Sequence, residues 1–250
     1  MRERIFGVVE EPLDVVAVGA HPDDVEIGCG GTLALLSKQG YRVGIIDLTD
    51  GEPTPKCPSP EVRLAEAQKA AEILGVQARV TLPLPNRRLM DGFKARMRLA
   101  RWLRRWRPRL VLGLGAGTPL ASPDHQQAVF ITAGAVFYCR LSKWAEYFEN
   151  LPPHTIPAFW HYFLAFRQLS PTRHQPVVVD IGSVLKKKLA AIGVYETQFS
   201  GEKASFLDRV RHFNRQQGLA AGFEAGEVLS PEGVLGTRDL MGLIFGSKAR

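Results

Sequence analysis

The chain has 250 residues, with 32 lysines and arginines against 25 aspartates and glutamates, and a formal net charge of +7. Hydrophobic residues make up 45% of the chain and charged residues 23%, which excludes a disordered tail, a collagen-like repeat and a coiled coil. A chain of this length buries roughly 70–75% of its unfolded surface, so one large domain is expected.

The cysteines and the N-terminal segment indicate the cellular compartment of the protein. Three cysteines, an odd number without CxxC spacing, predict reduced thiols and a cytoplasmic protein. The first residues carry acidic side chains and lack the apolar stretch of a signal peptide. No stretch approaches about 18 apolar residues, so we expect no membrane-spanning helix and no membrane partner.

Short β-branched runs alternate with helical patterns along the chain. Strands are predicted at 13–19, 41–49, 79–83, 110–114, 158–166 and 176–181, and helices at 31–40, 61–74, 96–107, 124–138, 183–199 and 206–222. This alternation implies parallel pairing with right-handed crossovers. The predicted fold class is therefore α/β, a Rossmann-like three-layer sandwich with a mainly parallel sheet, and ligands are expected at the carboxyl ends of the strands.

Two of these strands are followed by both histidine and carboxylate side chains. His21, Asp23 and Asp24 follow the first strand, and His125 follows the fourth. Two imidazoles and one carboxylate, from His21, Asp24 and His125, form a ligand set typical of catalytic zinc. Asp23 would then lie beside the metal and exchange protons with a metal-activated water. The pattern fits metal-assisted hydrolysis of an amide.

The same residues allow two other interpretations. In the first, residues 21–24 form only a turn in which Asp24 caps the next helix, and His125 is a surface histidine at a helix start. In the second, Gly28, Gly30 and Gly31 form a phosphate or dinucleotide cradle, although the order Gly-x-Gly-x-x-Gly is absent. At this point the sequence leaves the three interpretations open.

A basic run at 96–109 contains seven arginines. It could bind nucleic acid, or it could be an amphipathic helix whose apolar side carries Met97, Ala100 and Leu103. We favour the helix, because Pro108 leads directly into an apolar strand as expected of a crossover. Nucleic acid is therefore not an expected partner.

The segment 18–32, VGAHPDDVEIGCGGT, closely resembles the signature of the PIG-L/LmbE-like N-acetylglucosaminyl deacetylases. The shorter segments 48–52 (LTDGE), 63–67 (RLAEA) and 122–125 (SPDH) follow in the order found in that family. The resemblance covers about 13–185, and the segments 195–199 and 226–227 extend it more weakly. We therefore expect one deacetylase domain over residues 1–250, with a helical or irregular C-terminal part at about 186–250.

The resemblance implies a zinc-dependent N-deacetylase, an amide hydrolase that removes acetate from an N-acetylglucosamine-bearing small molecule. It assigns the metal to His21, Asp24 and His125, and a metal-bound water as the nucleophile. It assigns the general base to Asp23 and a substrate contact to Arg63. Other divalent transition metals suit the same ligands.

Further residues have less definite roles in this resemblance. Asp124 matches an aspartate that orients a ligand histidine, and Glu52 belongs to the second motif. Ser122 stands where the family commonly has a histidine near the developing oxyanion. His161 or His154 could replace that histidine, or Asp23 and the metal could suffice. Alternatively, the chain is a catalytically weak or inactive sugar-conjugate-binding relative.

The substrate is suggested by the overall layout, which resembles the bacillithiol-biosynthesis deacetylases. That likeness implies an N-acetylglucosaminyl malate-type conjugate. Its anionic malate would suit a basic rim made by Arg63, Arg87 and Arg88. Family habit also predicts a homo-oligomer.

Overall fold

A computed structural model describes residues 3–7, 11–164, 176–201 and 205–238. Its strands are β1 (Arg4–Phe6), β2 (Val15–Gly19), β3 (Val43–Asp47), β4 (Ala78–Thr81), β5 (Leu110–Leu114), β6 (Ala158–Tyr162), β7 (Val177–Asp180) and β8 (Gly226–Pro231). Its α-helices are α1 (Asp24–Lys38), α2 (Pro60–Leu74), α3 (Phe93–Trp106), α4 (Asp124–Cys139), α5 (Leu185–Gly193), α6 (Glu196–Phe199) and α7 (Phe206–Leu219). Two short 3-10 helices, η1 (Ala145–Phe148) and η2 (Gly182–Val184), complete the elements of the described residues.

The strands form one sheet in the order β1-β4-β3-β2-β5-β6-β8-β7. The pairs from β4 to β6 are parallel, whereas β1, β8 and β7 pair antiparallel at the two sides of the sheet. The mainly parallel sheet is confirmed. Strands β1 and β8 were not predicted, because three residues carry too little periodicity and β8 is bounded by glycine and proline.

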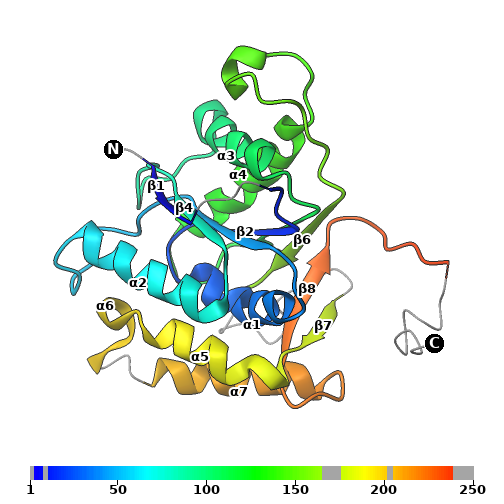
Figure 1. Ribbon diagram of the computed structural model, residues 1–250. Coiled ribbons are helices and arrows are strands. Elements are labelled where there is room, and N and C mark those ends of the chain that lie inside the picture. The colour runs from blue at the N-terminus through cyan, green and yellow to red at the C-terminus, as the bar shows by residue number, and fades with distance from the viewer. Residues whose placement is uncertain (1–2, 8–10, 165–175, 202–204, 239–250) are drawn as a thin grey trace.

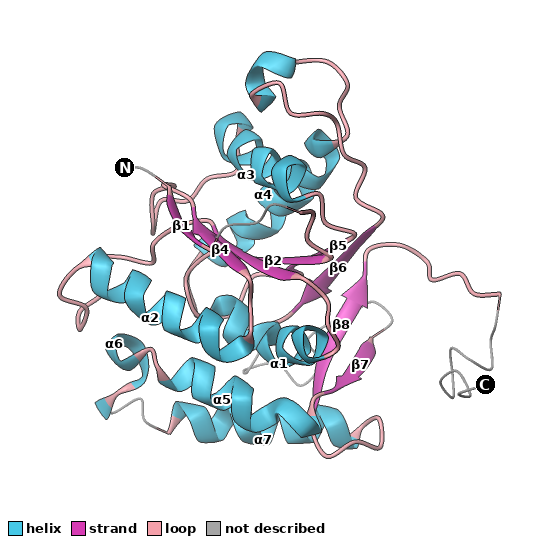
Figure 2. Ribbon diagram, in the orientation of Figure 1, coloured by secondary structure: helices cyan, strands magenta, loops and turns pink. Residues whose placement is uncertain are grey.

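Helices cover both faces of the sheet (Figures 1 and 2). α3 and α4 lie on one face, and α1 and α2 lie on the other. α5 packs on both α1 and α2, and α7 packs on α5, β7 and β8, so one side carries a second layer of helices. Strands β2 and β3 are buried along their whole length, as expected for the centre of a three-layer sandwich.

The basic run forms the predicted amphipathic helix, α3. Met97, Ala100 and Leu103 are buried on its inner side. Arg104 is also buried, and its Nε donates to the carbonyl oxygen of Cys139 at 2.9 Å, next to the end of α4. A cation is favourable at this position because the free carbonyls of a helix C-terminus carry partial negative charge.

Helix α1 begins seven residues before the predicted start at Gly31. It is kinked at Cys29, whose φ is −142°. A Cβ atom on Gly28 would lie 2.2 Å from Cδ2 of Tyr162, so a glycine is required for the close approach of that ring. The glycine-rich stretch is therefore helix packed against β6, and the predicted start of the helix at Gly31 was too late.

The kink at Cys29 exposes backbone groups that a charged pair from the C-terminal part of the chain satisfies. The N–H groups of Gly31 and Thr32 donate to the two carboxylate oxygens of Glu227, at 2.8 and 2.6 Å. Lys188 Nζ donates to the carbonyl oxygen of Ile27 at 2.8 Å and to Glu227 at 2.7 Å. The glycines do bind an anion, but it is the protein's own carboxylate, so the dinucleotide interpretation was wrong.

The predicted helix 183–199 is divided into η2, α5 and α6. The break falls at Tyr195, whose ring is buried and whose hydroxyl donates to Glu26 Oε1 at 2.7 Å. Placing this hydroxyl in the interior requires the chain to leave the helical path. Among the described residues, none of the helices has the length and apolar character needed to span a bilayer.

Candidate active site

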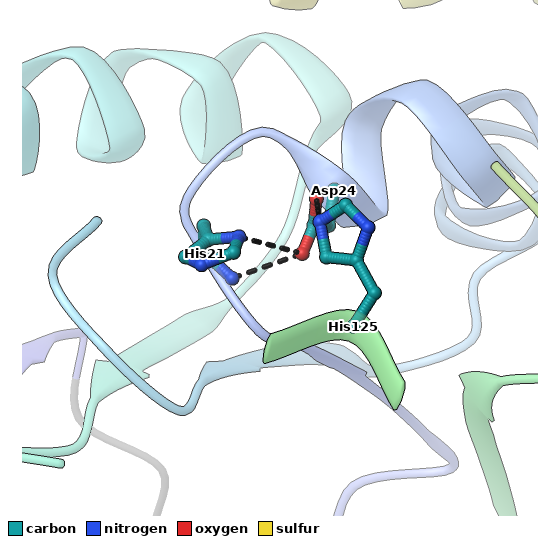
Figure 3. A group of neighbouring side chains, drawn as sticks. All are labelled: His21, Asp24 and His125. Carbon is teal, nitrogen blue, oxygen red and sulfur yellow. Dashed lines mark hydrogen bonds and ion pairs between the residues drawn. The ribbon is translucent and has the colours of Figure 1, made fainter. Parts of the chain in front are cut away.

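The predicted ligands meet at the carboxyl edge of two neighbouring parallel strands. β2 pairs with β5. His21 follows β2, Asp24 is the first residue of α1, and His125 lies in the first turn of α4 after β5. The three side chains point toward one another although they come from distant parts of the chain (Figure 3). This is the position at which open α/β sheets bind ligands.

The distances between these side chains suit one ion. One ligand atom from each of His21, Asp24 and His125 lies within 4.8 Å of the others. His21 Nδ1 is 3.5 Å from Asp24 Oδ2, and His125 Nε2 is 3.3 Å from Asp24 Oδ1. Two nitrogens and one carboxylate oxygen match the donors that zinc and its neighbours in the first transition series accept.

The opposite ring nitrogens of both histidines have partners of their own. His21 Nε2 lies 3.4 Å from Asp124 Oδ2, and His125 Nδ1 lies 2.9 Å from Thr118 Oγ1. The Asp124 carboxylate is itself held by the backbone N–H groups of Arg87 and Leu89, at 2.6 and 3.3 Å. Such contacts fix the orientation of metal-ligating imidazoles. The sequence left open which histidine Asp124 touches, and the structure brings it to His21.

Asp24 does not cap its own helix, so the interpretation of residues 21–24 as a simple capped turn was wrong. Its Oδ2 accepts the N–H groups of the preceding residues Ala20 and His21, at 3.0 and 2.9 Å. These bonds hold the carboxylate toward the strand end and toward both histidines.

The electrostatics of this cluster favour a cation. Burial opposes the charge on His21, but hydrogen bonds to Asp124 and Asp24 outweigh it and raise the pKa of His21 to about 10. Burial alone would raise the pKa of Asp24, yet His125 and His21 hold it well below its usual value. The field that keeps a proton on His21 also attracts a divalent ion, which competes with that proton for the ring.

Asp23 lies next to the ligands in an unusual backbone conformation. Its φ is +112° and ψ is −27°, a region that costs a non-glycine residue energy and is found at functional sites. Arg63 Nη2 donates to Asp23 Oδ2 at 2.8 Å and also to the carbonyl oxygen of Pro22. Burial raises the pKa of Asp23 to about 6, with Arg63 opposing and Asp24 adding to the rise.

Arg63 is not the exposed partner of Glu66 that helix spacing alone would suggest. Its side chain is buried, its guanidinium carbon lies 4.9 Å from the ring centroid of Tyr195, and its Nε and Nη1 atoms lack protein partners. Glu66 instead accepts from the N–H and hydroxyl of Thr197, at 2.9 and 2.6 Å. A buried cation with unused donors next to Asp23 can contact a polar substrate group.

A cleft of about 390 Å³ opens over this cluster. Besides the ligands, Asp23 and Arg63, its described lining comes from several loops and from the C-terminal helices: Ile27, Gly51, Thr54, Asn86, Arg87, Thr118, Ser122, Leu164, Gln198, Phe199 and Phe206. Ser122 is thus in the cleft, where its Oγ accepts the N–H of Asp124 at 3.3 Å. Arg88 and Glu52 are not part of the lining. Glu52 accepts from the N–H and hydroxyl of Thr54 at 2.5 and 2.9 Å, which shapes the loop after β3.

The two histidines proposed as substitutes at Ser122 lie elsewhere. His154 Nε2 donates to the carbonyl oxygen of Pro108 at 2.8 Å, before the start of β5 and so at the opposite end of that strand. His161 lies within β6, and its Nε2 contacts Glu232 rather than the cleft. Neither is among the cleft-lining residues, so the prediction of a compensating histidine at these positions was wrong.

Sequence reasoning missed the contribution of α6 and α7. Gln198 and Phe199 come from α6 and Phe206 from α7, all in the region predicted to be a helical or irregular appendage. Gln198 Nε2 donates to Thr54 Oγ1 at 3.0 Å, which ties α6 to the loop after β3. The weak resemblance at 195–199 was the only signal for this wall.

The fold and the site therefore combine an α/β sheet with a His–Asp–His cluster that could hold a metal ion and a second aspartate beside it. The family model for PIG-L, described as GlcNAc-PI de-N-acetylase, matches residues 16–136. A diacetylchitobiose deacetylase from Thermococcus kodakarensis is 31% identical over 205 residues, 76% of this chain and 73% of the relative. The chain belongs to the PIG-L deacetylase family.

Solved structures agree with this fold. A conserved protein from Thermus thermophilus is 32% identical, with a TM-score of 0.76 over 90% of this chain and 97% of that protein. An N,N'-diacetylchitobiose deacetylase from Pyrococcus horikoshii, complexed with its inhibitor, has a TM-score of 0.78 at 24% identity, over 91% of this chain and 88% of that one. At 24% identity, the second comparison bears on the fold alone.

Proposed function

We propose that this protein is a zinc-dependent N-deacetylase that removes acetate from an N-acetylglucosamine-bearing small molecule. The observation that carries the proposal is the placement of Asp23 beside the His21, Asp24 and His125 cluster, at the base of an open cleft. Membership of the PIG-L family and the likeness to a diacetylchitobiose deacetylase support the same reaction.

The three ligand residues would hold the metal, and their donor atoms fit it. When bound, a divalent ion supplies a water of lowered pKa and polarises the acetamide carbonyl. Asp124 and Thr118 fix the two imidazoles from behind, so the ligand nitrogens stay aimed at one point.

Asp23 is assigned both proton transfers. As a carboxylate it accepts a proton from the attacking water, and it then delivers this proton to the leaving amine. Among the described cleft-lining residues it is the only acid–base group apart from the ligands and the arginines. Arg63 holds the Asp23 carboxylate in place and offers its unpartnered N–H groups to the substrate. Ser122 can donate a hydrogen bond in the cleft but supplies no proton at neutral pH.

The best candidate substrate is an N-acetylglucosaminyl malate-type conjugate. Of the three arginines expected at a basic rim, Arg63 and Arg87 line the cleft. The charge of Arg63 is balanced by Asp23, so Arg87 is the cation available to an anion. We also propose that the protein acts as a homo-oligomer, as the family resemblance implies. Sedimentation of the purified protein tests this, and a monomer at micromolar concentration would contradict it.

The first test of the proposed function is release of free amine from a panel of conjugates. The panel contains N-acetylglucosamine, its malate conjugate and diacetylchitobiose, each with zinc-loaded protein and with a chelated control. Metal-dependent amine release is the expected result. Saturable binding without any amine release, from protein with one bound metal per chain, would instead favour an inactive sugar-conjugate binder.

A further inference from the structure

We propose that the protein also accepts N-acetylglucosamine conjugates whose bulky apolar aglycone ends in a carboxylate, and that this aglycone binds in a second groove beside the cleft. The inference rests on the proposed deacetylase function, because it assumes that the acetamide lies at the His–Asp–His cluster. It adds a subsite and a chemical class of aglycone larger than malate.

The groove adjoins the cleft. It encloses about 740 Å³, and Thr118, Leu164, Phe199 and Phe206 line both spaces. One wall is the loop after β5 at 118–121, and the other is α7. A sugar whose acetamide reaches the ligand cluster therefore has the groove directly beside it.

The surface of the groove nearest the cleft is aromatic and apolar. The rings of Phe199 and Phe206 are stacked, with centroids 4.6 Å apart and planes 8° from parallel. Across from them, Leu120 is 88% exposed and has a φ of +58°, a conformation that is rare for a branched side chain. The strained backbone and the exposed apolar side chain of Leu120 are both unfavourable in the free protein. An apolar ligand that packs on Leu120 would cover this side chain.

The wall of the groove that α7 forms carries basic side chains. Arg209 and His212 on α7 line it, and no aspartate or glutamate is found among its described lining residues. The Arg209 guanidinium carbon lies 5.5 Å from the ring centroid of Phe206. Within the described part of the chain, no carboxylate forms an ion pair with Arg209, whereas Arg211 on the same helix pairs with Asp208.

The apolar surface and the basic wall together fit a substrate laid along the groove. The acetamide meets the ligand cluster, the apolar part passes Phe199, Phe206 and Leu120, and the anionic end meets Arg209. A planar guanidinium matches a carboxylate through two parallel N–H donors.

The test compares aryl glycosides of N-acetylglucosamine that differ only in the groove. Methyl, phenyl, 4-carbamoylphenyl and 4-carboxyphenyl glycosides of both anomers are offered to the full-length, zinc-loaded protein. We expect kcat/KM for the phenyl compound to exceed that of the methyl compound by roughly 10- to 100-fold, because a ring is buried. The carboxylate should add about threefold to tenfold over its neutral carbamoyl isostere.

Three variants locate these two effects. Arg209→Gln should remove the preference for carboxylate over carbamoyl and leave the methyl compound unchanged. Leu120→Ser, a change at an exposed side chain that cannot disturb the core, should reduce the preference for phenyl over methyl. Arg211→Gln is the matched control, because it removes a cation from the same helix without changing the groove lining.

The inference fails if the methyl and phenyl compounds react equally well, or if Arg209→Gln keeps the carboxylate preference. Activity on the methyl compound in either case leaves the proposed deacetylase function standing. If no compound releases amine, calorimetric binding of the same four ligands replaces turnover. The same order of affinities would support the groove alone, and equal or undetectable affinities would overturn it.

Discussion

Two buried charged clusters lie along helix α1 and differ in how completely their polar atoms are paired. The first, at the start of the helix, comprises His21, Asp23, Asp24 and His125 and opens into the cleft. The second, after the kink, comprises Thr32, Lys188 and Glu227 and is closed to solvent.

The closed cluster is balanced within the protein. Glu227 accepts from Gly31, Thr32 and Lys188, and no atom of Lys188 or Glu227 is a buried group without a partner. The open cluster has an excess of carboxylates, and its Arg63 keeps two buried nitrogens unpaired. Complete pairing indicates a structural role, and incomplete pairing at an open surface indicates a place for ligands.

The largest effect is expected in the open cluster. Asp23→Asn should lower kcat by about 10²- to 10⁴-fold, because the amide cannot accept the proton. Metal content should stay close to wild type, whereas thermal stability should fall, because the buried Arg63 loses the charge of its ion-pair partner. The measurements are kcat on the best substrate and metal per chain by mass spectrometry. Asp208→Asn, an exposed carboxylate on α7, is the control. Near-normal kcat in Asp23→Asn would remove Asp23 from the mechanism.

In the closed cluster the expected effect is on stability. Lys188→Met should lower the free energy of unfolding by about 3–5 kcal/mol, because it leaves the buried Glu227 charge unpaired. The double variant Lys188→Met with Glu227→Gln should recover part of this loss, since no buried charge remains and the amide oxygen can still accept from the backbone. Urea unfolding of the three proteins measures both changes. A single variant as stable as wild type would show that Glu227 is not charged in the folded state.

A smaller effect is expected at Asp124, the carboxylate that contacts His21 of the open cluster. Asp124→Asn should weaken metal binding by about 10- to 100-fold, because His21 loses the acceptor that orients its ring. Competition with a chromophoric chelator gives the affinity, and circular dichroism checks that the fold is kept. Unchanged affinity would mean that the Asp24 contact alone orients His21.

The smallest effect is expected at the second supporting contact. Thr118→Val should weaken metal binding by less than Asp124→Asn, because a hydroxyl forms a neutral hydrogen bond with His125, and such bonds have about half the strength of charge-assisted ones. The same chelator competition applies, with Thr54→Val in the cleft wall as a control for loss of a hydroxyl. A larger loss at Thr118 than at Asp124 would reverse the proposed order of support.

Much of the fold was predictable because its signals are local. Alternating β-branched and amphipathic runs gave the central strands and α2, α3 and α4, with boundaries within a few residues. Helix α1 was predicted too short, because glycines are poor helix formers on their own. Only the tertiary contacts that Tyr162 and Glu227 make with this stretch explain why the helix includes the glycines.

The sequence by itself determined the sheet, its ligand-binding edge and the candidate ligands His21, Asp24 and His125, because polar residues directly after strands are a local pattern. Only the tertiary structure decided which groups become partners. It paired Asp124 with His21, placed His154 and His161 outside the cleft, filled the glycine cradle with Glu227, and brought α6 and α7 to the cleft wall. The physical reason is the long separation in sequence between the residues that make these contacts. Glu227 lies 196 residues from Gly31, and such a contact depends on the packing of the whole chain, not on any segment's own periodicity.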